Sequence, residues 1–224
     1  MARTGFRRGC PLVAFGALAA PAAALLFAAS VAQAGIYNGI GGFLPDAPDE
    51  GLTGVASFVI NVGDAGQVGS FNSLTITGFN HVFLGDLGAT LTAPDGTVIT
   101  LFERIGKTNP DAGFGDSSNF LGTYAFANGG SDIWAAAASV PGSGNVAQGT
   151  YFASAGLTGA AIDLQAAFGG KNAFGNWTLT ITDYSVGEAG AITGWSLNMG
   201  LVPAPSAAAM LVGAFASVGR RRRR

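Results

Sequence analysis

The chain has 224 residues, of which 49% are hydrophobic and only 11% are charged, and 36 are glycine. This composition excludes a coiled coil and a charge-rich disordered chain, and the single cysteine excludes a disulfide framework and a multi-cysteine metal site. The formal net charge of −2 is unevenly distributed, because eight of the 11 basic residues lie at the two ends and all 13 acidic residues lie between Asp46 and Glu188. We therefore expect an acidic domain between two basic terminal segments.

Residues 1–34 have the three parts of a secretory signal peptide. Three arginines within the first eight residues form a positively charged start, an apolar run follows, and Ala32-Gln33-Ala34 supplies small residues around a cleavage position. The pattern predicts export and cleavage by signal peptidase before Gly35. A retained transmembrane anchor is the alternative.

Residues 35–54 contain Pro45, Pro48 and several acidic side chains, and are predicted to be a leader segment, either a strand or a linker. Residues 55–201 form the predicted folded domain, because short β-branched runs between Gly-rich turns are typical of all-β proteins. We place no domain boundary within this range.

The clearest predicted strands alternate apolar and polar residues, so that every second side chain faces the core. These strands occupy residues 73–77, 87–92, 97–102, 177–183 and 191–199. Pro94-Asp95-Gly96 fits a tight turn between two of them, since Pro presets φ and Gly tolerates positive φ. Residues 109–149 are predicted to be long loops with short strands, and a single helical turn is predicted at 164–168. The fold expected is an all-β antiparallel sandwich or jelly roll.

The C-terminus has a second three-part pattern. The motif Val202-Pro203-Ala204-Pro205 precedes an apolar stretch, and a basic tail that includes Arg220, Arg221 and Arg222 follows. The apolar stretch falls short of the roughly 20 residues that span a bilayer, and the arginines favour the cytoplasmic side. We expect a short hydrophobic helix that tethers the chain transiently to the inner membrane during export.

Residues 202–224 resemble the PEP-CTERM sorting signal of Gram-negative bacteria that make exopolysaccharide. The resemblance implies that an exosortase-like membrane enzyme recognises and removes the tail, which would leave the protein at the cell surface or outside the cell. Ala204 stands where that family has glutamate. A plain C-terminal anchor and a polybasic membrane-surface patch are the alternatives.

Two blocks of the domain carry another resemblance. The first runs from His81 through Asp86-Leu87 to Leu101, and the second contains Gly175-Asn176-Trp177, Asp183 and Gly194-Trp195. Together they resemble the P domain found beside the catalytic domain of kexin- and furin-like subtilisin proteases, over about residues 56–200. The resemblance implies a jelly-roll β-sandwich in which the histidine has no catalytic role.

The residue inventory argues against an enzyme. His81 is the only histidine of the chain, so a Ser-His-Asp triad would have to use it, and no Gly-x-Ser-x-Gly motif occurs. We expect His81 to hydrogen-bond loop backbone instead. The acidic domain also argues against nucleic acid as a partner, because binding needs clustered Lys and Arg.

Several aspartates at strand ends or in Gly-rich loops are candidate calcium ligands. They are Asp86, Asp111, Asp116 and Asp183, of which Asp86, Asp116 and Asp183 are the predicted ligand set. Calcium takes six to eight oxygen ligands, often gathered from loops. The alternative is that Asp86 and Asp183 cap turns by accepting hydrogen bonds from backbone amides.

The chain has three tryptophans. Trp177 and Trp195 fall on the apolar faces of predicted strands, so we expect both in the core. Trp134 lies in a loop-rich stretch and is the candidate for stacking on a polysaccharide.

These observations predict a non-enzymatic exported protein of the cell surface or extracellular matrix, sorted through its tail, with exopolysaccharide or a surface protein as its partner. Two alternatives stay open. One is a carbohydrate-binding or adhesion module, and the other is an accessory P domain that assists a separate subtilisin-like protease.

Overall fold

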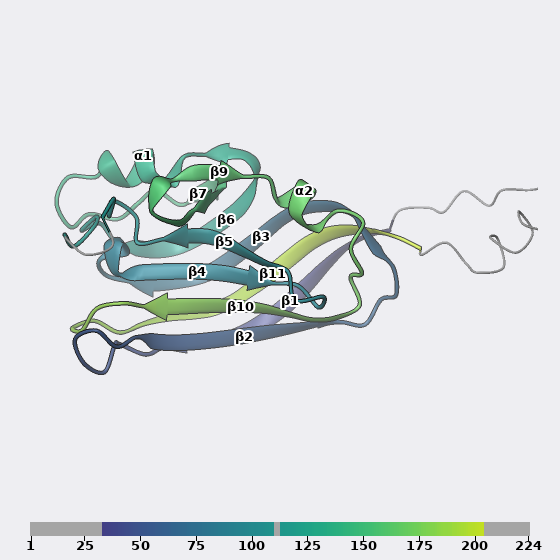
Figure 1. Cartoon of the computed structure of the whole chain (residues 1–224), viewed down its shortest axis with the longest axis horizontal. Helices are drawn as coiled ribbons and strands as arrows, with labels where there is room; N and C mark the ends of the chain where they lie inside the picture. The colour runs from purple at the N-terminus through teal and green to yellow at the C-terminus, as the bar shows by residue number, and fades with distance from the viewer. Residues whose placement is uncertain (1–32, 110–112, 204–224) are drawn as a thin grey trace, which may run out of the picture.

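Two β-sheets pack face to face in the computed structural model, which describes residues 33–109 and 113–203 (Figure 1). The five-stranded sheet contains, in spatial order, β1 (Gln33–Leu44), β11 (Gly190–Val202), β3 (Gln67–His81), β6 (Phe120–Ser131) and β7 (Gly149–Tyr151). The four-stranded sheet contains β2 (Gly54–Val62), β10 (Gly175–Asp183), β4 (Leu87–Thr92) and β5 (Val98–Glu103). The predicted all-β antiparallel sandwich is confirmed.

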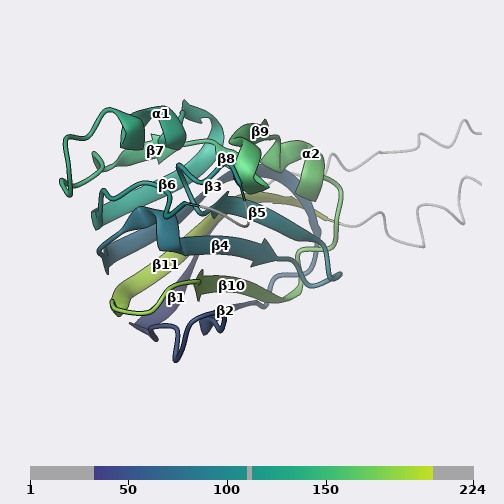
Figure 2. The same cartoon turned by 60° about the vertical axis from the view of Figure 1, so that its left-hand side comes forward.

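The strand order is that of a jelly roll. The chain crosses between the sheets so that the order β1-β11-β3-β6 faces the order β2-β10-β4-β5, which is the eight-stranded double Greek key of this architecture. Short elements complete the fold: the 3-10 turns η1 (Leu84–Asp86) and η2 (Gly156–Thr158), the helices α1 (Ile133–Ala138) and α2 (Leu164–Phe168), and the β8 (Ala153–Ala155) and β9 (Ala160–Ile162) pair. Figure 2 shows α1, β7 and α2 along the side of the sandwich away from β2.

The predicted alternation places side chains as expected. Trp177, Leu179 and Ile181 of β10 are buried between the sheets, and the threonines between them face outward. Trp177 and Trp195 are 0% and 2% exposed, so both tryptophans lie in the core as predicted. Burial of such large aromatic side chains supplies much of the driving force for packing the two sheets.

The structure differs from the predictions in two regions. β1 begins at Gln33, just before the segment predicted to be a leader strand or linker, and pairs with β11 along its length, so this segment adds a strand to the sandwich itself. The stretch 109–149 contains the 12-residue strand β6 and the helix α1 rather than only loops and short strands. Both regions are rich in Gly and Ala, which weakens the periodic signal on which strand prediction depends.

The described ends of the chain lie together at one end of the sandwich, because Gln33 at the start of β1 pairs with Leu201 near the end of β11 (Figure 1). Residues 1–32 of the predicted signal peptide lie outside the described residues, as do Asp111, Ala204, Pro205, Arg220, Arg221 and Arg222. No helix in the described ranges is long and apolar enough to cross a membrane.

Candidate functional site

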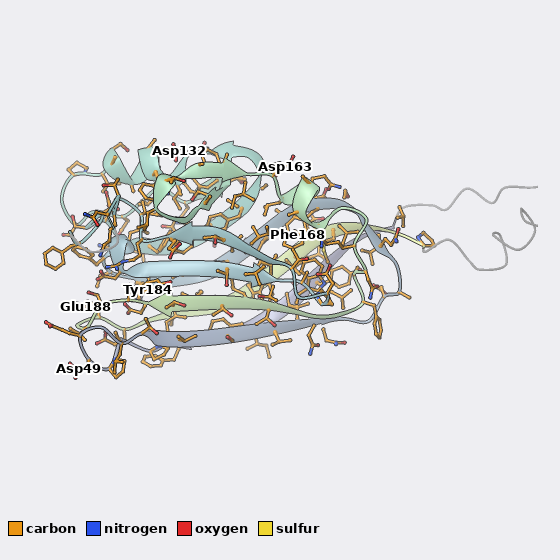
Figure 3. The ribbon with its side chains drawn as sticks, viewed as in Figure 1. Asp49, Asp132, Asp163, Phe168, Tyr184 and Glu188 are labelled. Atoms are coloured by element: carbon orange, nitrogen blue, oxygen red, sulfur yellow. The ribbon has the colours of Figure 1, made fainter. Side chains whose placement is uncertain are left out.

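Ionisable side chains gather at the end of the sandwich opposite the described chain ends. His81 ends β3, Asp86 closes η1 and Asp183 ends β10, so three segments far apart in sequence meet there. We call His81, Asp86, Asp183 and the neighbouring Arg104 and Tyr184 the strand-end cluster. Figure 3 labels Tyr184, directly after β10, at this end of the molecule.

His81 and Asp183 form a buried ion pair. The His81 Nε2 atom lies 3.1 Å from Asp183 Oδ2, and the two residues are 1% and 2% exposed. Because His81 belongs to the five-stranded sheet and Asp183 to the four-stranded sheet, the pair joins the two layers of the sandwich. The other Asp183 oxygen accepts a hydrogen bond from the Ser185 backbone N–H at 3.1 Å, which is the turn-capping role predicted for this aspartate.

Both ring nitrogens of His81 face oxygen atoms. Nδ1 contacts the Val82 carbonyl, which confirms the predicted bond to loop backbone, and Nε2 contacts the Asp183 carboxylate. Burial alone would lower the His81 pKa, but the hydrogen bond and charge of Asp183 oppose it, and the net direction of the pKa is upward. A protonated ring would satisfy both oxygen acceptors with its two N–H groups, which agrees with the upward direction of the His81 pKa.

Asp86 lies beside this pair, and its carboxylate group lacks part of the hydrogen bonding that it could make. Its Oδ1 atom is buried with no hydrogen-bond partner. Burial and the nearby charge of Asp183 raise the Asp86 pKa to about 6, against the opposing charges of Arg104 and His81 and a hydrogen bond with Ser185. The carboxyl group is therefore more easily protonated in the folded protein than in the unfolded chain.

Backbone strain is concentrated around the same cluster. In the described ranges, Phe83 and Arg104 are the only residues other than glycine with positive φ, at 60° and 42°. Such conformations cost free energy, and the surrounding structure must hold them. The Arg104 guanidinium lies 5.3 Å from the centre of the Tyr184 ring, and its Nε donates to the Gly85 carbonyl at 3.4 Å. The sequence contains no signal that pairs Arg104 with this turn.

The three aspartates predicted as calcium ligands do not converge. The Asp116 carboxylate turns to Ser118, whose backbone N–H and hydroxyl both donate to it. In residues 33–109 and 113–203 there is no group of three His, Cys, Asp or Glu side chains that could hold a metal ion. These residues do not fit a calcium site built on three carboxylates, and calcium binding stays a prediction.

Trp134, the predicted sugar-stacking residue, is on α1 and is half-buried. Its indole N–H donates to the Ser154 hydroxyl at 3.3 Å, and Gly159, at a φ of 65°, packs closely against its ring. The ring thus packs against the β8–β9 pair, which leaves only part of its surface for a ligand. Its role in sugar binding stays a prediction.

Exposed apolar side chains also lie on the neighbouring edge strands β1 and β2, each on the outer face of its own sheet. Ile36, Ile40 and Phe43 of β1 and Val55 and Val59 of β2 are exposed, with Ile40 at 87%. We call these five residues the β1–β2 edge. The strands are neighbours, since Gly39 and Gly42 of β1 lie against side chains of β2. Edge strands with exposed apolar side chains are candidates for pairing with another protein.

Comparison with known proteins gives one family match. Residues 143–199, which include β10 and most of β11, match the family model of the proprotein convertase P-domain. Among solved structures, the chain is similar to the crystal structure of the complex between an Aeromonas sobria serine protease and its chaperone, with 14% identity and a TM-score of 0.40. That similarity covers 77% of this chain but only 27% of the other one. No curated protein matches the chain.

The ion pair makes the His81 pKa a direct probe of the strand-end cluster. We expect Asp183→Asn to lower the His81 pKa, because only the Val82 carbonyl and the charge of Asp86 then oppose the effect of burial, and to reduce the free energy of unfolding at pH 6 by about 3 kcal/mol. The protonated pair stabilises the fold below the unfolded-state pKa of His81, and this contribution is lost as pH rises through the folded-state pKa. NMR titration of an untagged protein is unambiguous, since the chain has one histidine.

The matched control is Asp95→Asn, which breaks the exposed Lys171–Asp95 pair at 2.9 Å. An exposed pair contributes at most about 1 kcal/mol, and this substitution leaves the His81 pKa unchanged. A His81 pKa at or below its ordinary value in the parent protein would contradict the assignment.

Substitution of Asp86 should change the free energy of unfolding in the opposite direction. We expect Asp86→Asn to raise the free energy of unfolding at pH 7 by about 1 kcal/mol, because it removes a carboxylate that burial disfavours. In the parent protein, the raised folded-state pKa of Asp86 makes the free energy of unfolding fall as the pH rises from about 4 to about 6. The variant should not show this fall. Urea unfolding at pH 4, 5, 6 and 7 measures both effects. An equal loss of stability at every pH would show instead that the Asp86 hydrogen bonds outweigh its burial.

Proposed function

We propose that this protein is a non-catalytic accessory module of the P-domain type that binds another protein, in the first place a subtilisin-like protease. The observation that carries the proposal is the P-domain match over residues 143–199. The placement of His81 supports it, because this histidine is buried and both of its ring nitrogens face oxygen partners within the domain.

The β1–β2 edge is the surface we propose for the protein partner. Its exposed side chains are apolar and its two strands each pair on one side only, so the outer backbone groups are open to a further strand. Burial of an exposed Ile side chain at an interface contributes on the order of 1–2 kcal/mol. The centre of this surface is Ile40, the most exposed large apolar residue of the described chain.

Association with a secreted subtilisin-like catalytic domain from the same organism tests this proposal. We expect a complex in size-exclusion chromatography and calorimetry, and Ile40→Asp to weaken it about tenfold or more, since a charge would have to be buried. The matched control is Val98→Asp, which alters an exposed apolar residue of β5, at the far edge of the four-stranded sheet. Both variants keep the parent Tm. Failure of every such protease to bind the folded protein, or equal weakening by both variants, would refute the proposal.

We further propose that the chain reaches its partner by export, as its terminal segments indicate, and that an exosortase-like enzyme in a Gram-negative bacterium processes its tail. Two observations are consistent with this route. The predicted cleavage before Gly35 retains the β1 residues that pair with Met199 through Gly190. The sorting motif starts at Val202, the last residue of β11, so the tail begins where the sandwich ends.

Intact mass of the secreted protein, made in a host with an exosortase, checks both processing steps. We expect a mass that lacks residues 1–34 and the tail after about Pro205. Restoring the glutamate of the motif by Ala204→Glu should raise the processed fraction, and alanine at Arg220, Arg221 and Arg222 should lower it because the cytoplasmic anchor is lost. A secreted product that extends to Arg224 would contradict tail removal.

A further inference from the structure

A groove opens on the outer side of the five-stranded sheet, apart from the β1–β2 edge. It has a volume of about 490 Å³ and is lined by parts of β3, the start of β6 and the segment that leads into β7. Leu121 and Val146 contribute apolar surface, and the side-chain amides of Asn80, Asn145 and Gln148 border it. A hollow of this size with a few convergent polar groups is the usual form of a small-molecule site.

The groove is built by irregular strand pairing. The β3–β6 register shifts between Ile76 and Phe79, and Gly78 within the shift has a φ of 59°. On the other side of β6, the segment that leads into β7 pairs with the β6 region at two points. Asn119 pairs with Asn145, and Tyr124 pairs with Gly149. Between these two points no ladder pairing is formed in the described structure, and the strands separate around the groove.

Side chains hold the separated walls in place. The Tyr124 hydroxyl accepts from the Leu121 backbone N–H at 3.0 Å and donates to the Val146 carbonyl at 2.9 Å. The Gln148 carboxamide oxygen accepts from the Thr123 backbone N–H at 2.8 Å. Because Tyr124 is fully buried, these bonds fix the width of the groove before any ligand arrives, which lowers the entropic cost of binding.

The lining selects a class of ligand by its charge and its hydrogen-bonding groups. No Asp, Glu, Lys or Arg is among the residues that line the groove. Side-chain amides both donate and accept hydrogen bonds, which matches hydroxyl groups that also do both. Leu121, which is 51% exposed, offers an apolar surface to the C–H groups of a sugar ring. A polyanion would find no cation here and would be repelled by an acidic domain.

We propose that this groove binds a neutral oligosaccharide segment, with Asn80 and Asn145 as the hydrogen-bonding residues and Leu121 as the packing surface. The site is distinct from Trp134 and from the protein-binding edge. A protein partner on the β1–β2 edge and a saccharide in the groove would not compete, since β11 and β3 lie between β1 and β6.

Backbone amide NMR shifts of the exported domain, measured with cellohexaose, maltohexaose, mannohexaose and xylohexaose as probes, test the proposal. We expect at least one probe to shift the signals of Leu121, Gly122 and Asn145 in a saturable way. The Asn80→Ala/Asn145→Ala double variant should weaken that binding about tenfold or more, as expected for the loss of two hydrogen-bonding groups. Asn38→Ala, which removes an exposed amide from β1, is the matched control and should leave binding unchanged.

Two further measurements keep the outcome decisive. The Tm of each variant shows that the fold is intact, and a hyaluronan hexasaccharide and a neutral hexapeptide serve as probes of other chemistry. Ile40→Asp should leave saccharide binding unchanged, so failure of the protease-partner proposal does not affect this test. Absence of saturable shifts with all four neutral sugars, shifts confined to other surfaces, or binding of only the anionic sugar or the peptide would overturn the inference.

Discussion

The interaction on which the strand-end cluster depends is the buried ion pair between His81 and Asp183. A sandwich is held together mainly by apolar contacts between its sheets, and those contacts have little directional preference. A hydrogen-bonded charge pair at the ends of β3 and β10 fixes the relative position of these two strand ends, because the bond between the carboxylate and the ring nitrogen has a preferred geometry. Removal of one partner leaves a buried charge alone, so the pair constrains the two sheets more strongly than its net contribution to stability suggests.

The pair also determines the chemistry that this end of the molecule can perform. Both ring nitrogens of His81 face oxygen atoms, of Val82 and of Asp183, and the residue is almost completely buried. Burial and the charge of Asp183 raise the Asp86 pKa to about 6, although the charges of His81 and Arg104 oppose this rise. The strained backbone at Phe83 and Arg104 borders the same residues. The buried and strained residues at this end of the sandwich are therefore coupled to one another electrostatically.

The sequence was sufficient to predict the strands in which apolar and polar residues alternate regularly. β4, β5, β10 and β11 follow from alternation of apolar and polar residues, and α2 occupies the one predicted helical turn. β1 was not predicted as part of the sandwich because five of its 12 residues are small Gly or Ala, which blurs the alternation. The helix α1 has only six residues, four of them alanine, too short and uniform to show an amphipathic face.

The site was less accessible to sequence reasoning, for a physical reason. His81 and Asp183 are 102 residues apart, and no local pattern reports which strand ends meet across a sandwich. The calcium prediction grouped carboxylates by their position in loops, whereas the structure turns Asp116 towards Ser118. The groove was missed because it depends on a register shift, and pairing register is set by tertiary packing as much as by the residues of one strand.

The same topology explains how one small domain can present three separate surfaces. In a jelly roll, the first and last strands lie side by side, so the predicted N-terminal cleavage site and the C-terminal sorting motif start from one end of the sandwich. The strand-end cluster lies at the other end, and Asn80 of the groove is the residue before His81. Anchoring His81 to Asp183 therefore also fixes the end of β3 that borders the groove. An exported module tethered at one end would carry its preformed groove away from the membrane, with the apolar edge along its side free for a protein partner.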